Sequence, residues 1–107
     1  MGYKTEFTFT AENDLRDIGF YILDESKSLD IALNYVSKLR SSTRNLDVFP
    51  ESGNNPRNRV LVNLGCKYLA EGDYLIFYKI DKAAKVVYII AVLNGKMDYV
   101  KILKKRL

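Results

Sequence analysis

The sequence predicts an α+β fold: an N-terminal strand, an antiparallel helical hairpin, a mainly antiparallel three-strand meander and a short basic C-terminal tail. Residues 3–10 alternate between apolar and polar side chains, and residues 11–49 place apolar side chains at helical spacing. Two apolar β-type segments, Tyr74–Ile80 and Val86–Leu93, are joined by a short polar link. Helices in one half and strands in the other are typical of helices packed on a sheet. We expect one domain spanning residues 1–107.

The first strand is predicted over Tyr3–Thr10, with Phe7 and Phe9 on its buried face. Thr10 stands where the N-cap of a helix belongs, because threonine accepts a hydrogen bond from the first helical turn. The first helix is therefore expected from Ala11 to about Glu25.

The second helix is predicted from Leu29 to about Phe49, with Ser28 as its N-cap. One stripe of it would face the sheet. That stripe comprises Leu29, Ala32, Leu33, Val36, Leu39, Thr43, Leu46 and Phe49. Gly19, inside the first helix, indicates close approach of this second helix.

Residues 50–59 contain two prolines and a glycine, which predicts a loop without regular elements. The second strand is expected over Val60–Leu64 and Lys67–Leu69, irregular at Gly65. The segment Gly95–Leu107 reads either as a short helix or as a last strand, and its end as a basic tail that frays in solvent.

The strands Tyr74–Ile80 and Val86–Leu93 are apolar on both faces, which is typical of central strands. Strict alternation in the second segment predicts two opposed sets. These are Val86, Tyr88, Ile90 and Val92 against Val87, Ile89, Ala91 and Leu93. We expect the helices to cover one face of the sheet, and either more of this chain or a bound partner to cover the other.

Histidine is absent, which excludes Ser-His-Asp, Cys-His and His-metal mechanisms. The single cysteine, Cys66, can form no internal disulfide and is interpreted as a small buried hydrophobe. We expect a cytoplasmic protein without signal peptide, membrane span, metal, organic cofactor or small-molecule ligand. Residues 1–50 carry six basic and eight acidic side chains, whereas residues 51–107 carry eleven basic and five acidic. A basic half favours an acidic or polyanionic partner, or simply a solvated lysine-rich surface.

An ordered set of motifs carries a family resemblance. A basic residue and Tyr-Leu at 67–69 precede Gly72-x-Tyr-Leu-Ile-Phe-Tyr-basic-Ile-Asp, and the last β run ends in x-Gly-basic-x-Asp-Tyr at 94–99. Phe49-Pro50-Glu51-Ser52-Gly53 links the two halves. In these motifs the chain resembles the RelE/ParE superfamily of toxins from type II toxin–antitoxin (plasmid stabilisation) systems. The resemblance implies the same strand, helical hairpin and three-strand order.

The chain departs from the superfamily pattern in a consistent way. Lys67 replaces the usual arginine before Tyr-Leu, Lys79 the arginine after the strand tyrosine, and Lys96 the arginine after glycine. The histidine before that glycine is replaced by Asn94. Positive charge is retained, but the bidentate guanidinium fork and the proton carrier are lost.

The resemblance implies one of two targets. ParE-like members act on DNA gyrase and are not nucleases, and we favour this target because proton carriers are missing. RelE-like members are ribosome-dependent mRNA endoribonucleases, for which the candidate catalytic residues here are Lys67, Lys79, Lys96 and Tyr99. Candidates for binding nucleic acid or target are Arg57, Arg59, Lys67 and Lys96. Whether the protein is an enzyme depends on this choice.

Each catalytic candidate also has a structural interpretation. Lys79 can be a lysine whose stem packs on the sheet, Lys67 can counter Glu71 or Asp73, and the Tyr99 ring can cap the core. The resemblance further implies a cognate acidic antitoxin that wraps the sheet and the basic half as a helix plus an added strand. An inactive toxin relic, or an interaction domain without a target, is the remaining alternative.

Overall fold

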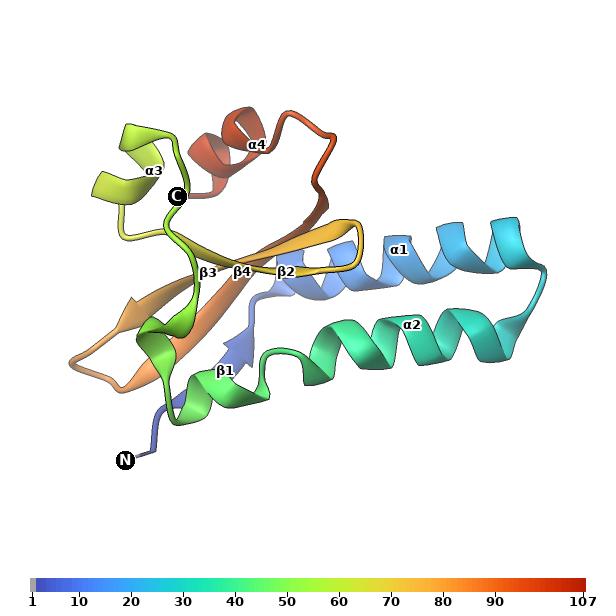
Figure 1. The fold of residues 1–107 in the computed structure, drawn as a ribbon, viewed down its shortest axis with the longest axis horizontal. Helices are drawn as coiled ribbons and strands as arrows, with labels where there is room; N and C mark the ends of the chain where they lie inside the picture. Colours follow the sequence, from blue (N-terminus) through green and yellow to red (C-terminus); the bar gives the residue numbers. More distant parts are fainter. Residues whose placement is uncertain (1) are drawn as a thin grey trace.

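The computed structural model describes residues 2–107 and has three layers (Figure 1). The sheet consists of β1 (Lys4–Phe7), β2 (Lys67–Glu71), β3 (Tyr74–Asp81) and β4 (Val86–Asn94), in the order β1-β4-β3-β2. The helices are α1 (Phe9–Ser26), α2 (Leu29–Ser41), α3 (Arg59–Asn63) and α4 (Tyr99–Arg106), with 3₁₀ turns at Arg44–Asp47 and Pro50–Ser52. β1 is parallel to β4, and the other neighbours are antiparallel. The predicted fold class is confirmed.

β1 is shorter than predicted, and α1 begins two residues early. The Thr8 hydroxyl, rather than Thr10, accepts the hydrogen bond that caps α1, from the Ala11 N–H at 3.2 Å. The chain therefore turns away from the sheet after Phe7, and Phe9 is 80% exposed on the helix instead of buried on a strand. β1 consequently covers β4 only as far as Ile89.

The helical hairpin is confirmed, but α2 ends at Ser41 rather than near Phe49. The side chains of Ser42 and Thr43 donate hydrogen bonds to the carbonyls of Leu39 and Arg40, which competes with continuation of the helix. The predicted stripe buries Ala32, Leu39, Thr43 and Leu46, whereas Leu29, Leu33 and Phe49 are exposed.

Two details of the hairpin follow the sequence closely. Ser28 caps α2 by accepting a hydrogen bond from the Ile31 N–H at 3.3 Å. A Cβ built on Gly19 would lie 3.3 Å from Val36 Cγ2, so the glycine allows the two helices to approach closely.

The segment Val60–Leu64, predicted as a strand, is mostly helical and lies largely within α3. The Asn58 side chain accepts a hydrogen bond from the Leu61 N–H at 3.1 Å and so caps a single helical turn. Only Leu61 of this helix is buried. The 50–59 loop likewise contains one 3₁₀ turn that was not predicted.

A β-bulge changes the predicted faces of β4. Tyr78 pairs with Ile89, but the next residue back along β3, Phe77, pairs with Ala91, so Ile90 is an extra residue. Beyond Ile90 the alternation is therefore reversed, and Val92 joins Val87 and Ile89 in the core under the helical hairpin.

The chain itself covers both faces of the sheet. The first core lies between the sheet and the hairpin, and the second lies between the sheet and the pair α3 and α4. The last segment is thus a helix, one of its two predicted states, and Leu103 is fully buried. Among residues 2–107, none of the helices has both the length and the hydropathy needed to cross a bilayer.

Candidate functional site

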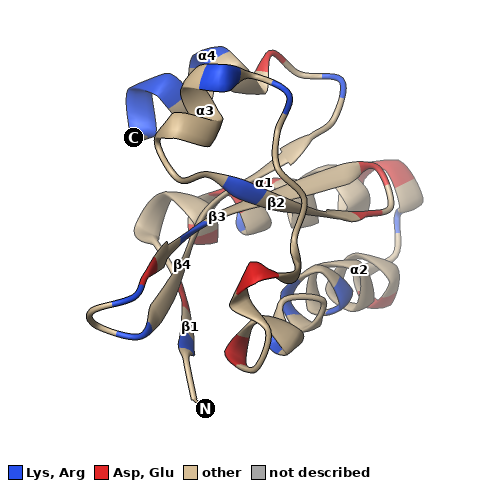
Figure 2. Cartoon of the chain, turned by 60° about the vertical axis from the view of Figure 1, so that its left-hand side comes forward, with Lys and Arg blue, Asp and Glu red and all other residues tan. Residues whose placement is uncertain are grey.

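The layer formed by α3, α4 and the loops leading into them carries a concentration of positive charge (Figure 2). Six exposed cations of this layer form no ion pair within residues 2–107. They are Arg57, Arg59, Lys96, Lys101, Lys104 and Lys105. We call this surface the basic layer. Its charge is free to act on a partner.

The basic layer contains one acidic side chain, Asp98, and this residue is already used as a helix cap. Asp98 accepts a hydrogen bond from the Lys101 N–H at 3.3 Å at the start of α4. Lys101, Lys104 and Lys105 stand at helical spacing i, i+3 and i+4, so they share one stripe. Lys104 and Lys105 lie in the last turn of α4, where their charges also suit the C-terminal end of the helix dipole.

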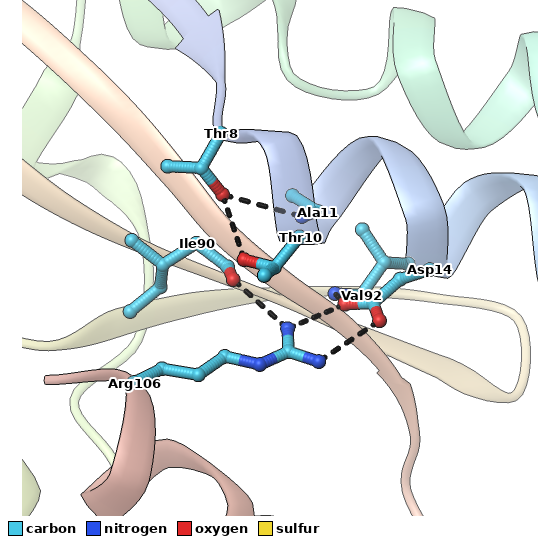
Figure 3. A network of polar contacts seen from close by, with 7 residues as sticks. All are labelled: Thr8, Thr10, Ala11, Asp14, Ile90, Val92 and Arg106. Carbon is cyan, nitrogen blue, oxygen red and sulfur yellow. Dashed lines mark hydrogen bonds and ion pairs between the residues drawn. The ribbon is translucent and has the colours of Figure 1, made fainter.

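A hydrogen-bonded network fixes α4 to the body of the protein (Figure 3). Arg106 Nη1 and Nη2 donate to Asp14 Oδ2 and Oδ1 at 2.7 and 3.0 Å. Arg106 Nη1 also donates to the Ile90 carbonyl at 3.0 Å, and Asp14 accepts from the Val92 N–H at 2.9 Å. The hydrogen bonds to Asp14 raise the pKa of Arg106. This network satisfies the β4 edge beyond the point where β1 ends.

The structure places three of the predicted binding residues on the α3 and α4 side of the sheet and one on the other side. Arg57, Arg59 and Lys96 belong to the basic layer. Lys67 pairs with Tyr78 of the neighbouring strand, which faces the helical hairpin, so Lys67 lies on the hairpin face of the sheet, away from the basic layer. Its ammonium donates to Asn55 Oδ1 at 3.0 Å. Lys67 forms no ion pair with Glu71 or Asp73 among residues 2–107, and Glu71 pairs instead with Lys38 at 3.6 Å.

The catalytic candidates on the strands are divided between the two faces of the sheet. Lys79 lies on the α3 and α4 side of the sheet, two positions from Phe77 on the same strand. The Tyr99 ring packs on Phe77 with centroids 5.2 Å apart, as its structural interpretation predicted. Lys96 lies two residues after Asn94, which pairs with Tyr74 on β3. Lys67 pairs with Tyr78, which is four positions further along β3, or roughly 13 Å away.

Cys66 offers no nucleophile in the folded protein. The side chain is 1% exposed, which confirms its interpretation as a buried hydrophobe. Burial raises the pKa of the thiol to about 11, against a smaller lowering by the charge of Lys79. The thiolate is therefore scarce at neutral pH.

Sequence reasoning missed Asp14, Arg106 and the lysine stripe of α4. Asp14 carries the ordinary signal of an acid in a first helical turn, and Arg106 that of a charged tail. No local spacing joins two residues 92 positions apart. The i, i+3, i+4 spacing of the lysines was visible in the sequence, but its meaning depended on whether the tail was helical.

A second surface lies on the helical hairpin, between its two helices. An apolar groove of about 220 Å³ runs there and is lined chiefly by Gly19, Phe20, Leu23, Leu33 and Val36. Phe20 is 62% and Leu33 58% exposed, so the groove is bordered by exposed apolar side chains from both helices.

Residues 5–99 match the family model described as the ParE toxin of the type II toxin–antitoxin system parDE. The chain belongs to this ParE toxin family. The resemblance to the RelE/ParE superfamily is thereby confirmed, and the protein is a toxin of a type II toxin–antitoxin system. No curated protein matches the sequence at a significant level.

Three solved structures share the fold of this chain. The chromosomal ParDE system from P. aeruginosa matches with a TM-score of 0.71 and 16% identity, over 86% of this chain and 95% of that one. The toxin–antitoxin complex RelBE2 from Mycobacterium tuberculosis matches with a TM-score of 0.61 and 23% identity, over 88% of this chain and 99% of that one. The isolated E. coli RelE toxin matches with a TM-score of 0.51 and 16% identity, over 98% of this chain and 99% of that one.

The ParE-family toxin thus presents two distinct surfaces on opposite sides of its sheet. The basic layer offers charge held by a fixed helix, and the hairpin groove offers exposed apolar side chains.

Proposed function

We propose that this ParE-family toxin inhibits growth in the cytoplasm by binding DNA gyrase, without nuclease activity, until a cognate antitoxin neutralises it. The family match over residues 5–99 carries the proposal. In this proposal Arg57, Arg59, Lys67 and Lys96 contact the target.

The separation of the catalytic candidates supports a non-enzymatic action. Cleavage of RNA through its 2′-hydroxyl needs a base and an acid within hydrogen-bond reach of the same phosphate. Lys67 lies on the hairpin face of the sheet, whereas Lys79 and Tyr99 lie on the other. A ribonuclease would also need a proton carrier in place of the missing histidine.

Two assays on the purified protein distinguish the targets. The first adds it to a cell-free bacterial translation reaction and maps the reporter mRNA by primer extension. The second measures DNA supercoiling by purified gyrase. We expect intact mRNA and inhibited supercoiling. New 5′ ends inside ribosome-bound codons would instead establish the endoribonuclease, and inactivity in both assays would favour the relic.

We further propose that the hairpin groove receives an amphipathic helix of the antitoxin, an acidic partner. Exposed Phe20 and Leu33 would anchor it, because a helix in a groove binds through apolar side chains at successive turns. The solved ParDE and RelBE2 neighbours come from toxin–antitoxin pairs, which supports a partner of this kind.

Co-purification tests the antitoxin surface. The toxin is expressed with the small acidic protein encoded beside it, as wild type, Leu33→Glu or Val48→Glu. Val48 is 66% exposed and lies outside the groove, so it is a matched control. We expect Leu33→Glu alone to lose the partner. Equal recovery with both variants would exclude the groove, and no recovery with the wild type would exclude the partner.

A further inference from the structure

A pocket of about 420 Å³ lies between α1 and the end of β4, beyond the last residue of β4 that pairs with β1. We call it the α1–β4 pocket. Its first wall comes from α1, where Asp17 and Tyr21 are four residues apart and therefore share one face of the helix. Its second wall includes Leu93 of β4 and Tyr74 of β3, and Met97, in the loop after β4, also lines it.

The pocket carries negative charge, although the formal net charge of the protein is +4. Two carboxylates and no lysine or arginine line it among residues 2–107. Arg106 binds Asp14 through two hydrogen bonds, so the charge of Asp14 is compensated. Asp17 is exposed and forms no ion pair within the same residues, and its neighbour Arg16 lines the hairpin groove instead. Asp17 thus gives the pocket one uncompensated negative charge.

Two tyrosines give the pocket aromatic surface. Tyr21 is 58% exposed, whereas Tyr74 is 7% exposed and makes an edge-on contact with Tyr35, at a centroid distance of 5.9 Å. Burial raises the pKa of Tyr74, so its hydroxyl is neutral at physiological pH and adds no charge. Aromatic faces attract cations, and a planar guanidinium both stacks on a ring and pairs with a carboxylate. The chemistry of the pocket therefore suits a guanidinium group.

The pocket also has apolar surface that suits the methylene stem of an arginine side chain, at Leu93 and Met97. Met97 is 46% exposed, and like Tyr21 it leaves this part of the pocket open to solvent. Small-molecule sites usually enclose most of their ligand. An open pocket of this kind is better suited to a single side chain that projects from a larger partner.

We propose that the α1–β4 pocket binds an exposed arginine side chain of a partner protein. The guanidinium pairs with Asp17 and stacks on Tyr21, and the methylene stem contacts Leu93 and Met97. The pocket thus recognises a basic group, in contrast to the basic layer. The proposal is independent of the gyrase and antitoxin proposals, because none of the residues assigned to those partners lines the pocket.

The test is an NMR titration of the full-length, ¹⁵N-labelled protein, which detects the weak binding of single side chains. The probes are the Nα-acetyl N-methylamides of arginine, citrulline and lysine. Citrulline has nearly the shape of arginine without its charge. We expect arginine to bind at least about fivefold more tightly than citrulline, because only arginine gains the cation–π and carboxylate contacts. Arginine should also exceed lysine, which has no planar group to stack.

Two variants and a matched control locate the site. Asp17→Asn should weaken the arginine probe by about threefold or more and leave citrulline unchanged. Tyr21→Leu keeps an apolar side chain but removes the ring, and should also weaken arginine. Glu25→Gln makes the same change in net charge at an exposed position of α1 outside the pocket, and should change the affinity by less than about 1.5-fold because solvent and salt screen distant charges. Circular dichroism confirms that each variant folds.

A short peptide with one central arginine tests whether a protein can supply the side chain. It should bind at least as tightly as the arginine probe, and the same peptide with citrulline should bind more weakly. Weaker binding of the arginine peptide than of the small probe would assign the pocket to a small guanidinium compound and overturn the assignment to a protein. Equal affinity for arginine and citrulline, or equal losses in Asp17→Asn and Glu25→Gln, would overturn the site itself.

Discussion

Asp14, near the start of α1, and Arg106, at the end of α4, form a bidentate ion pair between residues 92 positions apart. Their side chains are only 12% and 23% exposed. The pair also satisfies the Val92 N–H and the Ile90 carbonyl, two backbone groups at the edge that β1 leaves uncovered. The ion pair therefore satisfies the free edge of β4 and also fixes α4, and with it the basic layer, to the body of the protein.

Replacing Asp14 by asparagine should destabilise the protein by about 2–3 kcal/mol, because it leaves the Arg106 charge uncompensated and partly buried. α4 should also lose protection of its amides against hydrogen exchange, since its last turn loses its anchor. Urea unfolding followed by circular dichroism, together with native-state hydrogen exchange, measures both effects.

Glu12→Gln is the matched control for this prediction. It breaks another bidentate carboxylate–arginine pair, to Arg40, whose side chains are 46% and 47% exposed. Exposed pairs contribute about 1 kcal/mol or less. Similar losses of stability in Asp14→Asn and Glu12→Gln would contradict the role given to the Asp14–Arg106 pair.

Glu12 gives a prediction for the pH dependence of stability. The hydrogen bond from Arg40 lowers the pKa of Glu12 below its ordinary value of 4.5. A carboxyl group whose pKa is lower in the folded state contributes stability that is present above the unfolded pKa and is lost as pH falls through the folded pKa. The wild type should therefore exceed Glu12→Gln in unfolding free energy at pH 6, by less than about 1 kcal/mol because the pair is exposed.

That difference should shrink below about pH 4.5 and vanish once Glu12 is protonated in both states. Urea unfolding of both proteins between pH 3 and pH 7 measures it. A difference that stays constant with pH would show that the glutamine acts through helix packing and not through charge.

The Tyr78 side chain binds the backbone of the turn at residues 50–53, which links the helical and strand halves of the chain. Its hydroxyl donates to the Pro50 carbonyl at 2.8 Å and accepts from the Gly53 N–H at 2.9 Å, and the residue is fully buried. Tyr78→Phe keeps the ring but leaves both backbone groups without that partner, so we expect a loss of about 1–3 kcal/mol.

Tyr68→Phe is the control for the Tyr78 prediction. The Tyr68 hydroxyl has no hydrogen-bond partner within residues 2–107, and its ring packs on Phe77. The Tyr68→Phe substitution should change the unfolding free energy by less than about 0.5 kcal/mol. Thermal unfolding of the two variants compares them directly, and equal shifts in Tm would contradict the hydroxyl's role.

The sequence predicted what depends on local periodicity and failed where a single side chain intervened. Alternation and helical spacing located the hairpin and the two central strands. One threonine hydroxyl moved the start of α1, and one asparagine turned Val60–Leu64 from a strand into part of a helix. A capping hydrogen bond decides the conformation of a single helical turn, and the apolar pattern of a five-residue segment is too short to predict a different outcome.

The faces of β4 show a different limit. A bulge at Ile90 reverses the alternation, and nothing in a run of β-branched residues marks where an extra residue enters. In the folded protein Asp14 and Arg106 form hydrogen bonds with the Val92 N–H and the Ile90 carbonyl, next to the bulge, and these partners are distant in the sequence. The positions of the candidate residues likewise depend on contacts between distant parts of the chain. The sequence therefore predicted that Lys67 and Lys96 carry charge, but not that they lie on opposite sides of the sheet.

Tyr99 offers the sharpest link between the fold and the mode of action. Its ring packs on Phe77 at the first turn of α4, so the ring, rather than the hydroxyl, holds this end of the basic layer. Tyr99→Phe should leave both stability and growth arrest unchanged. Tyr99→Ala should cost about 2–3 kcal/mol and weaken growth arrest, because the helix loses a core contact.

Growth of a bacterial host after induction, together with thermal unfolding of the purified variants, tests this pair of substitutions. The Lys96→Ala variant serves as a third sample, because it removes an exposed cation without touching the core. If Tyr99→Phe and Lys96→Ala both fold normally and both abolish growth arrest, proton transfer by the hydroxyl becomes the better explanation. The toxin would then be a ribonuclease whose site forms only on its target.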